Sequence, residues 1–321
     1  MPSAADLSES LHPLVVLVGP TASGKTTLAI RIAEEFAGEI VSCDAVAVYR
    51  GLDIGSAKPT PSEQARVPHH AIDLLAPDQA STAGDYAREG RRALAAIATR
   101  GRLPIVTGGT GLYLRALLEG LAPAPQRNDA LRERLRLRAE RFGPGHLHAL
   151  LRRLDPAAAG AIHPNDAPKL IRSLEVTVAG SQPQTEQWRA GRDPLRGFRV
   201  LQLGLNPPRS ALYERINARA AAMFEGGLLA ETAAIREQFG DSARALTSLG
   251  YAQALAVLRG EASLPDAIAA AQQGHRNYAK RQLTWFRRDK SIHWLAGFGD
   301  DLEIQQKACM LVRSFLARPG T

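Results

Sequence analysis

The sequence of 321 residues lacks the features of a secreted or membrane protein. It has only two cysteines, Cys43 and Cys309, whose wide separation excludes a disulfide framework and a cysteine-based metal site. No apolar run approaches the length that spans a bilayer. The segment Met1–Pro13 is acidic and lacks the basic and apolar regions of a secretory signal. We therefore expect a protein of the reducing cytoplasm with no membrane partner.

Positive charge exceeds negative charge, and it is concentrated in two segments. The formal net charge is +8. Residues 123–200 contain 14 Lys/Arg against 8 Asp/Glu, and residues 275–290 contain 6 against 1. A surface that binds a polyanion such as nucleic acid has this kind of distribution, but so does an ordinary solvated face. Charge alone leaves both interpretations open.

The first 120 residues alternate between strand and helix patterns. Hydrophobic residues make up 45% of the chain, which is enough for one large core or two smaller ones. We expect strands at 14–18, 39–43, 70–75 and 103–107, and helices at 26–37 and 83–100, the latter capped by Ser81 or Thr82. This alternation predicts the α/β class, with a parallel sheet covered by helices.

The composition changes after Gly120, where prolines mark a boundary. An arginine-rich stretch follows, with helices expected at 129–142, 146–154 and 167–178 and a loop over 181–197. A strand at 198–205 returns to the core, and helices are expected at 209–223, 228–238, 251–258 and 263–288. We thus predict a core of residues 12–122 and 198–315 that carries a basic helical insertion, 123–197.

The segment G-P-T-A-S-G-K-T matches the P-loop pattern of phosphate-binding proteins. A buried strand precedes it and a helix follows it, so backbone N–H groups and a helix N-terminus would converge on one anion. The lysine would add positive charge, and the final hydroxyl could join a Mg²⁺ shell. The alternative is an ordinary glycine turn. The predicted diphosphate-binding residues are Gly19, Pro20, Thr21, Ala22, Ser23, Gly24, Lys25 and Thr26, with Thr26 as the metal ligand.

Asp44 directly follows the second expected strand. In parallel sheets ligands bind at the carboxyl ends of strands, where the P-loop and the segment Gly108–Gly111 also lie. A carboxylate there could take a proton from a nucleophile, hold a water on magnesium or cap a turn. Its position alone leaves the three roles open.

The motifs beyond the P-loop occur in a recognisable order. They are D-x4-Y-x-G-x-DIG-S-AKP from Asp44 to Pro59, PHHxID from Pro68, GGTGLY from Gly108, HPND from His163, RSLEV from Arg172, LGY from Leu249 and YAKRQLTWFR from Tyr278. In this order, over about residues 14–294, the chain resembles the tRNA dimethylallyltransferases, also called tRNA isopentenyltransferases. The resemblance implies a P-loop NTPase-like core.

The resemblance also implies a reaction. Dimethylallyl diphosphate would give its five-carbon group to N6 of adenosine 37, beside the tRNA anticodon, and diphosphate would leave. Asp44 would be the general base, because a delocalised adenine amine is a poor nucleophile. Lys25, Arg219 and Mg²⁺ would neutralise the leaving diphosphate. Without the resemblance, Arg219 is better interpreted as a solvent-facing helix arginine.

The family further implies contacts with the anticodon stem-loop of tRNA. Its single-stranded loop can present a splayed base, and the target adenine must be flipped into a pocket. We expect the protein to act as a monomer. The residues that correspond to family tRNA contacts are Asp44, Ala45, Val46, Ala47, Thr110, Arg132, Pro168, Lys169, Leu170, Ile171, Arg172, Thr247, Ser248, Leu249, Gly250, Tyr251, Lys280 and Arg281.

Some positions depart from the common family pattern. They are Ala45, Ala47, Lys169, Ala252 and His275. Lysine at 169 cannot make the bidentate contact of arginine. The sequence also allows two alternative functions, a P-loop small-molecule kinase and a tRNA-binding protein without catalysis. A P-loop small-molecule kinase would not need the two basic segments, and a tRNA-binding protein without catalysis would not need Asp44.

Overall fold

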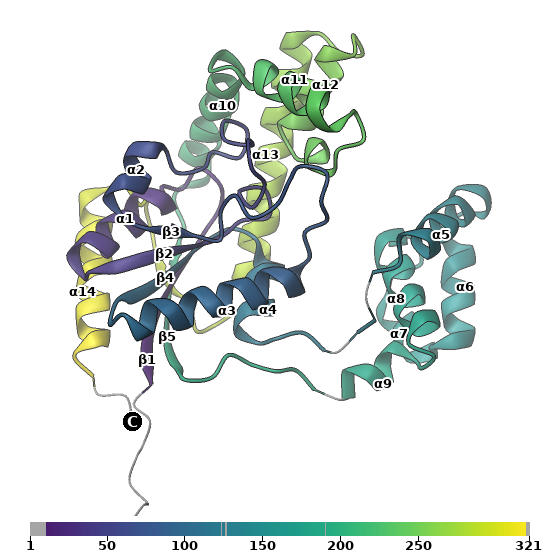
Figure 1. Cartoon of the computed structure of the whole chain (residues 1–321), viewed down its shortest axis with the longest axis horizontal. Helices are drawn as coiled ribbons and strands as arrows, with labels where there is room; N and C mark the ends of the chain where they lie inside the picture. Colours follow the sequence, from purple (N-terminus) through teal and green to yellow (C-terminus); the bar gives the residue numbers. More distant parts are fainter. Residues whose placement is uncertain (1–10, 123, 126, 190, 319–321) are drawn as a thin grey trace, which may run out of the picture. The chain divides into compact units, whose positions relative to one another are not determined.

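The computed structural model describes residues 11–122, 124–125, 127–189 and 191–318. The chain forms two compact units, shown in Figure 1. The first unit combines Met1–Leu118 with Leu195–Thr321, and the second is Glu119–Pro194. The sequence predicts the insertion at residues 123–197, which lies within four residues of the second unit at each end.

The first unit is built on a six-stranded sheet in which every pairing is parallel. The strand order is β3-β2-β4-β1-β5-β6. β1 is central, and its residues Leu14–Val18 are apolar and buried, as expected of a strand covered on both faces. The predicted α/β class with a parallel sheet is therefore confirmed. The strands are β1 His12–Val18, β2 Gly38–Cys43, β3 His69–His70, β4 Leu103–Gly108, β5 Phe198–Leu205 and β6 His293–Leu295.

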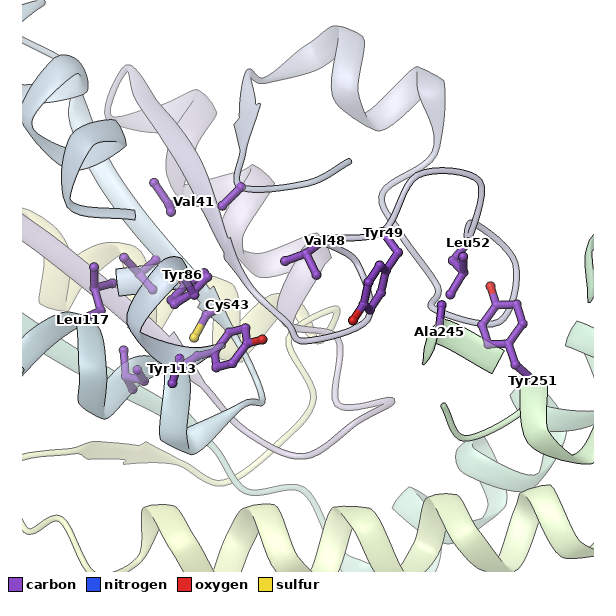
Figure 2. Close-up of a cluster of buried hydrophobic side chains, with 14 of the residues drawn as sticks. Val41, Cys43, Val48, Tyr49, Leu52, Tyr86, Tyr113, Leu117, Ala245 and Tyr251 are labelled. Atoms are coloured by element: carbon purple, nitrogen blue, oxygen red, sulfur yellow. The ribbon is translucent and has the colours of Figure 1, made fainter. Parts of the chain in front are cut away.

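Helices cover both faces of this sheet, as Figure 1 shows. Alternate strand residues pack on opposite sides: Val15 and Leu17 lie in one core cluster, and Leu14 and Val16 in another. The first cluster contains residues of α1 (Lys25–Glu35) and α14 (Leu302–Leu316). The second contains residues of α3 (Ala83–Thr99), α4 (Gly111–Leu118) and α13 (Leu264–Phe286). Figure 2 shows part of the second cluster, where Tyr86 and Tyr113 lie beside Cys43.

The long helix α13 connects the outer helices of the first unit to the sheet. α13 contacts α10, α12 and α4, so it runs from the outer helices back to the sheet (Figure 1). The remaining elements are α2 Pro61–Arg66, α10 Arg209–Glu225, α11 Leu228–Phe239, the 3₁₀ helix η1 Arg244–Thr247 and α12 Tyr251–Leu258.

The second unit is helical and has a core of its own. Leu135, Leu147, Leu151, Leu170 and Leu174 are buried together. Its helices are α5 Asp129–Phe142, α6 Pro144–Leu154, α7 Pro156–Ala161, α8 Ala167–Ala179 and α9 Gln184–Arg189.

Two local predictions are wrong. The strand expected over 70–75 is limited to the two residues of β3, because the backbone turns into the left-handed region at Ala71 (φ 60°) and Asp73 (φ 54°). Leu75 returns only to an isolated bridge with Tyr49. The loop expected over 181–197 contains α9. Thr82 caps α3, in agreement with the sequence.

Strand register brings three loops to one edge of the sheet. Val18 and Cys43 both pair with Gly108, so β1, β2 and β4 end at the same level. The P-loop, Asp44 and the segment 109–111 therefore leave the sheet side by side. β2 and β4 approach closely here, since a Cβ at Gly108 would lie 2.1 Å from the carbonyl oxygen of Cys43.

This close approach predicts a strong effect of one methyl group. Gly108→Ala should lower the free energy of unfolding by about 3 kcal/mol or more, because the strands must separate to admit the Cβ. Gly84→Ala is the control, since the nearest atoms to its Cβ are 3.8 Å away and it lies in α3. It should leave stability unchanged or raise it by up to about 1 kcal/mol. Denaturant titration of both variants checks this, and a Gly108→Ala protein as stable as wild type would contradict it.

Candidate active site

A cleft lies at this edge of the sheet, within the first unit. It contains about 890 Å³ of space not filled by protein atoms, part of it open to solvent. The chemically active side chains among its lining residues are Lys25, Thr26, Asp44, Arg219, Tyr278 and Gln282. The structure therefore brings the three predicted catalytic residues, Lys25, Asp44 and Arg219, to one place.

The P-loop forms the floor for an anion. Gly24 (φ 84°) precedes α1, and no side chain caps the helix N-terminus. Gly299 N–H donates to the carbonyl of Ser23 at 2.8 Å, which braces the loop from outside the cleft. Uncapped backbone N–H groups and the helix dipole at one point favour a bound phosphate group.

Two cations border this floor. Lys25 Nζ donates to the carbonyl oxygen of Pro20 at 2.7 Å. Burial and the neighbouring Arg219 lower the pKa of Lys25 to about 7, although Asp44 opposes this shift. Arg219 donates to the hydroxyl of Thr21, and its own pKa is also lowered by burial. Arg219 lines the cleft, as the resemblance implies, and does not face solvent as its helix position alone would suggest.

Asp44 uses only one carboxylate oxygen for structure. Oδ1 accepts hydrogen bonds from the backbone N–H groups of Val46 at 2.8 Å and Ala47 at 3.2 Å, so the residue does cap a turn. Across the described residues, no hydrogen bond reaches Oδ2. The N–H of Ala45 donates to the Thr110 hydroxyl at 3.1 Å, which ties the Asp44 loop to the loop after β4. Oδ2 is therefore available to a ligand or a proton.

One face of α13 forms a wall of the site. Tyr278 and Gln282 line the cleft, and His275 is buried one turn before Tyr278. Burial and Asp44 raise the pKa of Tyr278 to about 12, so this phenol stays neutral. Burial and Arg219 lower the pKa of His275 to about 4, which makes the imidazole neutral at physiological pH. The wall adds no charge to the cleft.

Sequence reasoning assigned no role to several residues of the cleft. Lys58 and His69 line it, together with Gln282. All three belong to quoted motifs, AKP, PHHxID and YAKRQLTWFR, so the motifs were the available signal. Lys58 is buried and pairs with Asp53 at 2.8 Å and Asp73 at 2.6 Å. These ion pairs indicate that Lys58 holds the segments of Asp53 and Asp73 together rather than binding a ligand.

Two predicted tRNA contacts have no exposed side chain. Leu170 is 0% exposed within the core of the second unit. Tyr251 is 0% exposed as well: its hydroxyl donates to Glu231 at 2.5 Å and accepts from Gly55 N–H at 3.1 Å. Figure 2 shows the Tyr251 ring below the loop that carries Leu52. These side chains hold other segments in place, and their contact with tRNA stays a prediction.

Two arginines of the second unit share one buried carboxylate. Glu175 is 0% exposed, and it pairs with Arg132 at 2.8 Å and Arg172 at 2.6 Å. Both guanidinium groups remain partly exposed. This shared carboxylate fixes the orientation of both guanidinium groups, and their partly exposed faces stay accessible to a ligand.

The other predicted tRNA contacts are distributed over both units. Pro168 and Lys169 are exposed and Ile171 is partly buried on α8. Around η1, Thr247 is exposed, Ser248 and Leu249 are partly buried, and Gly250 is buried; none of the four lines the cleft. Lys280 and Arg281 are exposed on α13, and Ala47 lines the cleft. Their contacts with tRNA stay predictions.

The cleft residues fit a magnesium ion that is held mainly by a ligand. Mg²⁺ takes oxygen ligands, and in nucleotide sites it usually binds one or two protein groups plus waters and phosphates. Thr26 supplies a hydroxyl at the start of α1, beside the anion cradle. Among the described residues there is no cluster of three or more His, Cys, Asp or Glu side chains for a protein-only metal site.

Comparisons with known proteins agree over most of the chain. A family model described as IPP transferase matches residues 47–289, and one described as isopentenyl transferase matches residues 12–69. The tRNA dimethylallyltransferase of Koribacter versatilis is 58% identical, covering 94% of this chain and 98% of the relative. That of Solibacter usitatus is 51% identical over 95% and 100%.

Solved structures give the same result. A full-length tRNA isopentenylpyrophosphate transferase from Bacillus halodurans has a TM-score of 0.69 and 34% identity, covering 95% of this chain and 96% of that one. A eukaryotic dimethylallyltransferase acting on tRNA has a TM-score of 0.79 and 25% identity, covering 95% and 80%. No helix among the described residues is long and apolar enough to cross a membrane.

The low pKa of Lys25 predicts a pH-linked uptake of a proton. In the free protein Lys25 is protonated at pH 6 and mostly neutral at pH 8, and a bound diphosphate raises its pKa. Binding should therefore take up more protons at pH 8 than at pH 6, and affinity should fall by up to about tenfold per pH unit above 7. Calorimetry with inorganic diphosphate, in buffers of different ionisation heat, measures this.

Two variants control that measurement. Lys25→Met should lose the additional proton uptake at pH 8. Any proton uptake that this variant still shows comes from the titration of the diphosphate itself. Lys307→Met, at an exposed site on α14, should behave as wild type. Equal proton uptake by wild type and Lys25→Met would show that Lys25 does not titrate with the anion.

Proposed function

The chain belongs to the family of tRNA dimethylallyltransferases and is a prenyltransferase that modifies tRNA. We propose that it moves the dimethylallyl group from dimethylallyl diphosphate to N6 of adenosine 37, next to the anticodon, in the cytoplasm. The observation that supports this most is the presence in one cleft of an anion cradle and a carboxylate with a free oxygen. The anion cradle suits the leaving diphosphate, and the carboxylate suits the acceptor amine.

The cradle serves the departure of diphosphate. As the C–O bond to the prenyl group breaks, negative charge grows on the bridging oxygen. The uncapped N-terminus of α1, Lys25 and Arg219 supply positive charge where that oxygen must lie. Thr26 would hold Mg²⁺, which when bound would add further charge neutralisation. Lys25 must carry its proton to act here, and the bound anion ensures that it does.

Asp44 serves the acceptor. The adenine amine attacks the allylic carbon, a C–N bond forms and the amine becomes positively charged. Oδ2 then accepts a proton from N6, while Oδ1 remains bonded to the backbone of Val46 and Ala47. The hydrogen bonds fix the direction of the carboxylate, so no side-chain rotation is needed at the moment of proton transfer.

The target base has to reach this carboxylate inside a cleft. An adenine stacked in the anticodon loop cannot do so, and single-stranded loops allow a base to be splayed out at modest cost. Basic residues can hold the surrounding phosphates: the exposed Lys280 and Arg281 on α13, and the partly exposed Arg132 and Arg172 on the second unit. We propose these as the tRNA-binding cations.

The kinase alternative has less support. A metabolite kinase shares the P-loop and the parallel sheet, but its relatives would not be tRNA-modifying enzymes across nearly the full chain. The proposed function is tested with purified protein, Mg²⁺, labelled dimethylallyl diphosphate and unmodified tRNA. Label should enter tRNA with adenosine at 37 and should not enter the same tRNA with guanosine there. Label in both tRNAs would contradict the assignment to that base.

Removal of the base should slow the chemistry without weakening binding. Asp44→Asn keeps an Oδ1 acceptor for the Val46 and Ala47 N–H groups but loses basicity. We expect single-turnover transfer to fall by a factor of about 10² or more, with tRNA affinity within about threefold of wild type. Rapid-quench kinetics and filter binding measure the two quantities. Asp85→Asn, at the exposed start of α3, is the control. Turnover like wild type in Asp44→Asn would exclude Asp44 as the base.

The basic residues predict a steep salt dependence. The logarithm of tRNA affinity should fall linearly with the logarithm of salt concentration, because phosphate contacts release counterions. Lys280→Gln and Arg281→Gln should each reduce the slope by about one. Lys307→Gln on α14 should leave it unchanged. A flat plot for wild type would remove the basic surfaces from the interface.

A further inference from the structure

Gln282 is the one polar side chain of the cleft that bonds to two of its loops among the described residues. It lies on α13 and is only 4% exposed. Its Oε1 accepts from the backbone N–H of Thr21 at 2.7 Å, and its Nε2 donates to the carbonyl of Gly109 at 3.1 Å. One amide thus joins the P-loop to the loop after β4.

The two loops lead to opposite sides of the reaction. On the diphosphate side, the Thr21 hydroxyl accepts from Arg219, the second cation of the cradle. On the acceptor side, Gly109 adjoins Thr110, whose hydroxyl accepts from the N–H of Ala45, next to the proposed base. Gln282 is therefore the middle link of a continuous hydrogen-bonded path from Arg219 to the Asp44 loop.

The fit around this amide is tight. A Cβ at Gly109 would lie 1.9 Å from Nε2 of Gln282, so the residue at 109 must be glycine for the bond to form. Thr21 offers a backbone donor and Gly109 a backbone acceptor. The primary amide of Gln282 pairs with both through two separate atoms while remaining uncharged. A carboxylate would answer only the donor, and it would add negative charge beside the diphosphate.

We infer that Gln282 is a positioning residue for prenyl transfer, which sets the separation between the leaving diphosphate and the Asp44 carboxylate. This rests on the proposed function. Donor and base sit on different loops, and the barrier to transfer depends on their spacing. An error of about 1 Å in such a spacing can cost about 10²-fold in rate.

The first test replaces the amide by a group of similar length. Gln282→Met loses both hydrogen bonds, and Gln282→Glu retains the acceptor for Thr21 N–H but loses the donor to Gly109. In single-turnover assays with labelled dimethylallyl diphosphate and tRNA, both should transfer label about 10- to 100-fold more slowly than wild type. For Gln282→Met, the Kd values for tRNA and for inorganic diphosphate should stay within about threefold. Gln273→Met, at an exposed site on the same helix, should match wild type.

A double mutant separates positioning from mere structural support. If Gln282 acts by placing the donor against the base, its loss should matter little once the base is gone. We expect Gln282→Met to slow an Asp44→Asn enzyme by less than about threefold. Equal slowing in both backgrounds would overturn the inference, and so would wild-type rates in the single variants. If Gln282→Met does not fold, Gln282→Asn carries the same comparison, because it is a neutral amide one methylene too short to reach both loops. Failure of wild type to label tRNA would overturn the proposed function instead.

Discussion

The parallel pairing of β1, β2 and β4 is the constraint on which the site depends. It aligns Val18 and Cys43 with Gly108, so that three loops leave the sheet at one level. The absence of a side chain at Gly108 allows the strands to approach closely enough for that alignment. The P-loop offers an anion site and Asp44 provides a carboxylate. Thr110 bonds directly to the Asp44 loop, and Gly109 is joined to the P-loop through Gln282.

Charge balance explains how these loops coexist. Burial lowers the pKa of both Lys25 and Arg219, Arg219 lowers that of Lys25 further, and Asp44 partly compensates both shifts. A bound diphosphate completes the compensation, because it stabilises the two cations. The neutral wall of α13, with Tyr278, His275 and Gln282, keeps this balance within the cleft. The empty site is thus electrostatically less favourable than the occupied one, which suits an enzyme that must bind an anionic donor.

The sequence predicted the parts of this account that depend on local patterns. The P-loop motif, the buried strands and the position of Asp44 at a strand end follow from apolar runs and glycine spacing, and the family motifs supplied Arg219. The short β3 was missed because the left-handed turns at Ala71 and Asp73 follow from tertiary contacts rather than residue type. Burial of Tyr251 and Leu170, and the bridge made by Gln282, join residues far apart in sequence, so no local pattern could reveal them.

The central claim is that one cleft holds the leaving diphosphate and the base that receives the N6 proton. The most direct measurement is a crystal structure with an anticodon stem-loop and the unreactive thiolodiphosphate analogue of the donor. The account predicts the diphosphate on the backbone N–H groups at the start of α1, and N6 of the flipped adenine about 3 Å from Asp44 Oδ2. A diphosphate bound outside the P-loop, or an N6 that faces another side chain, would contradict it.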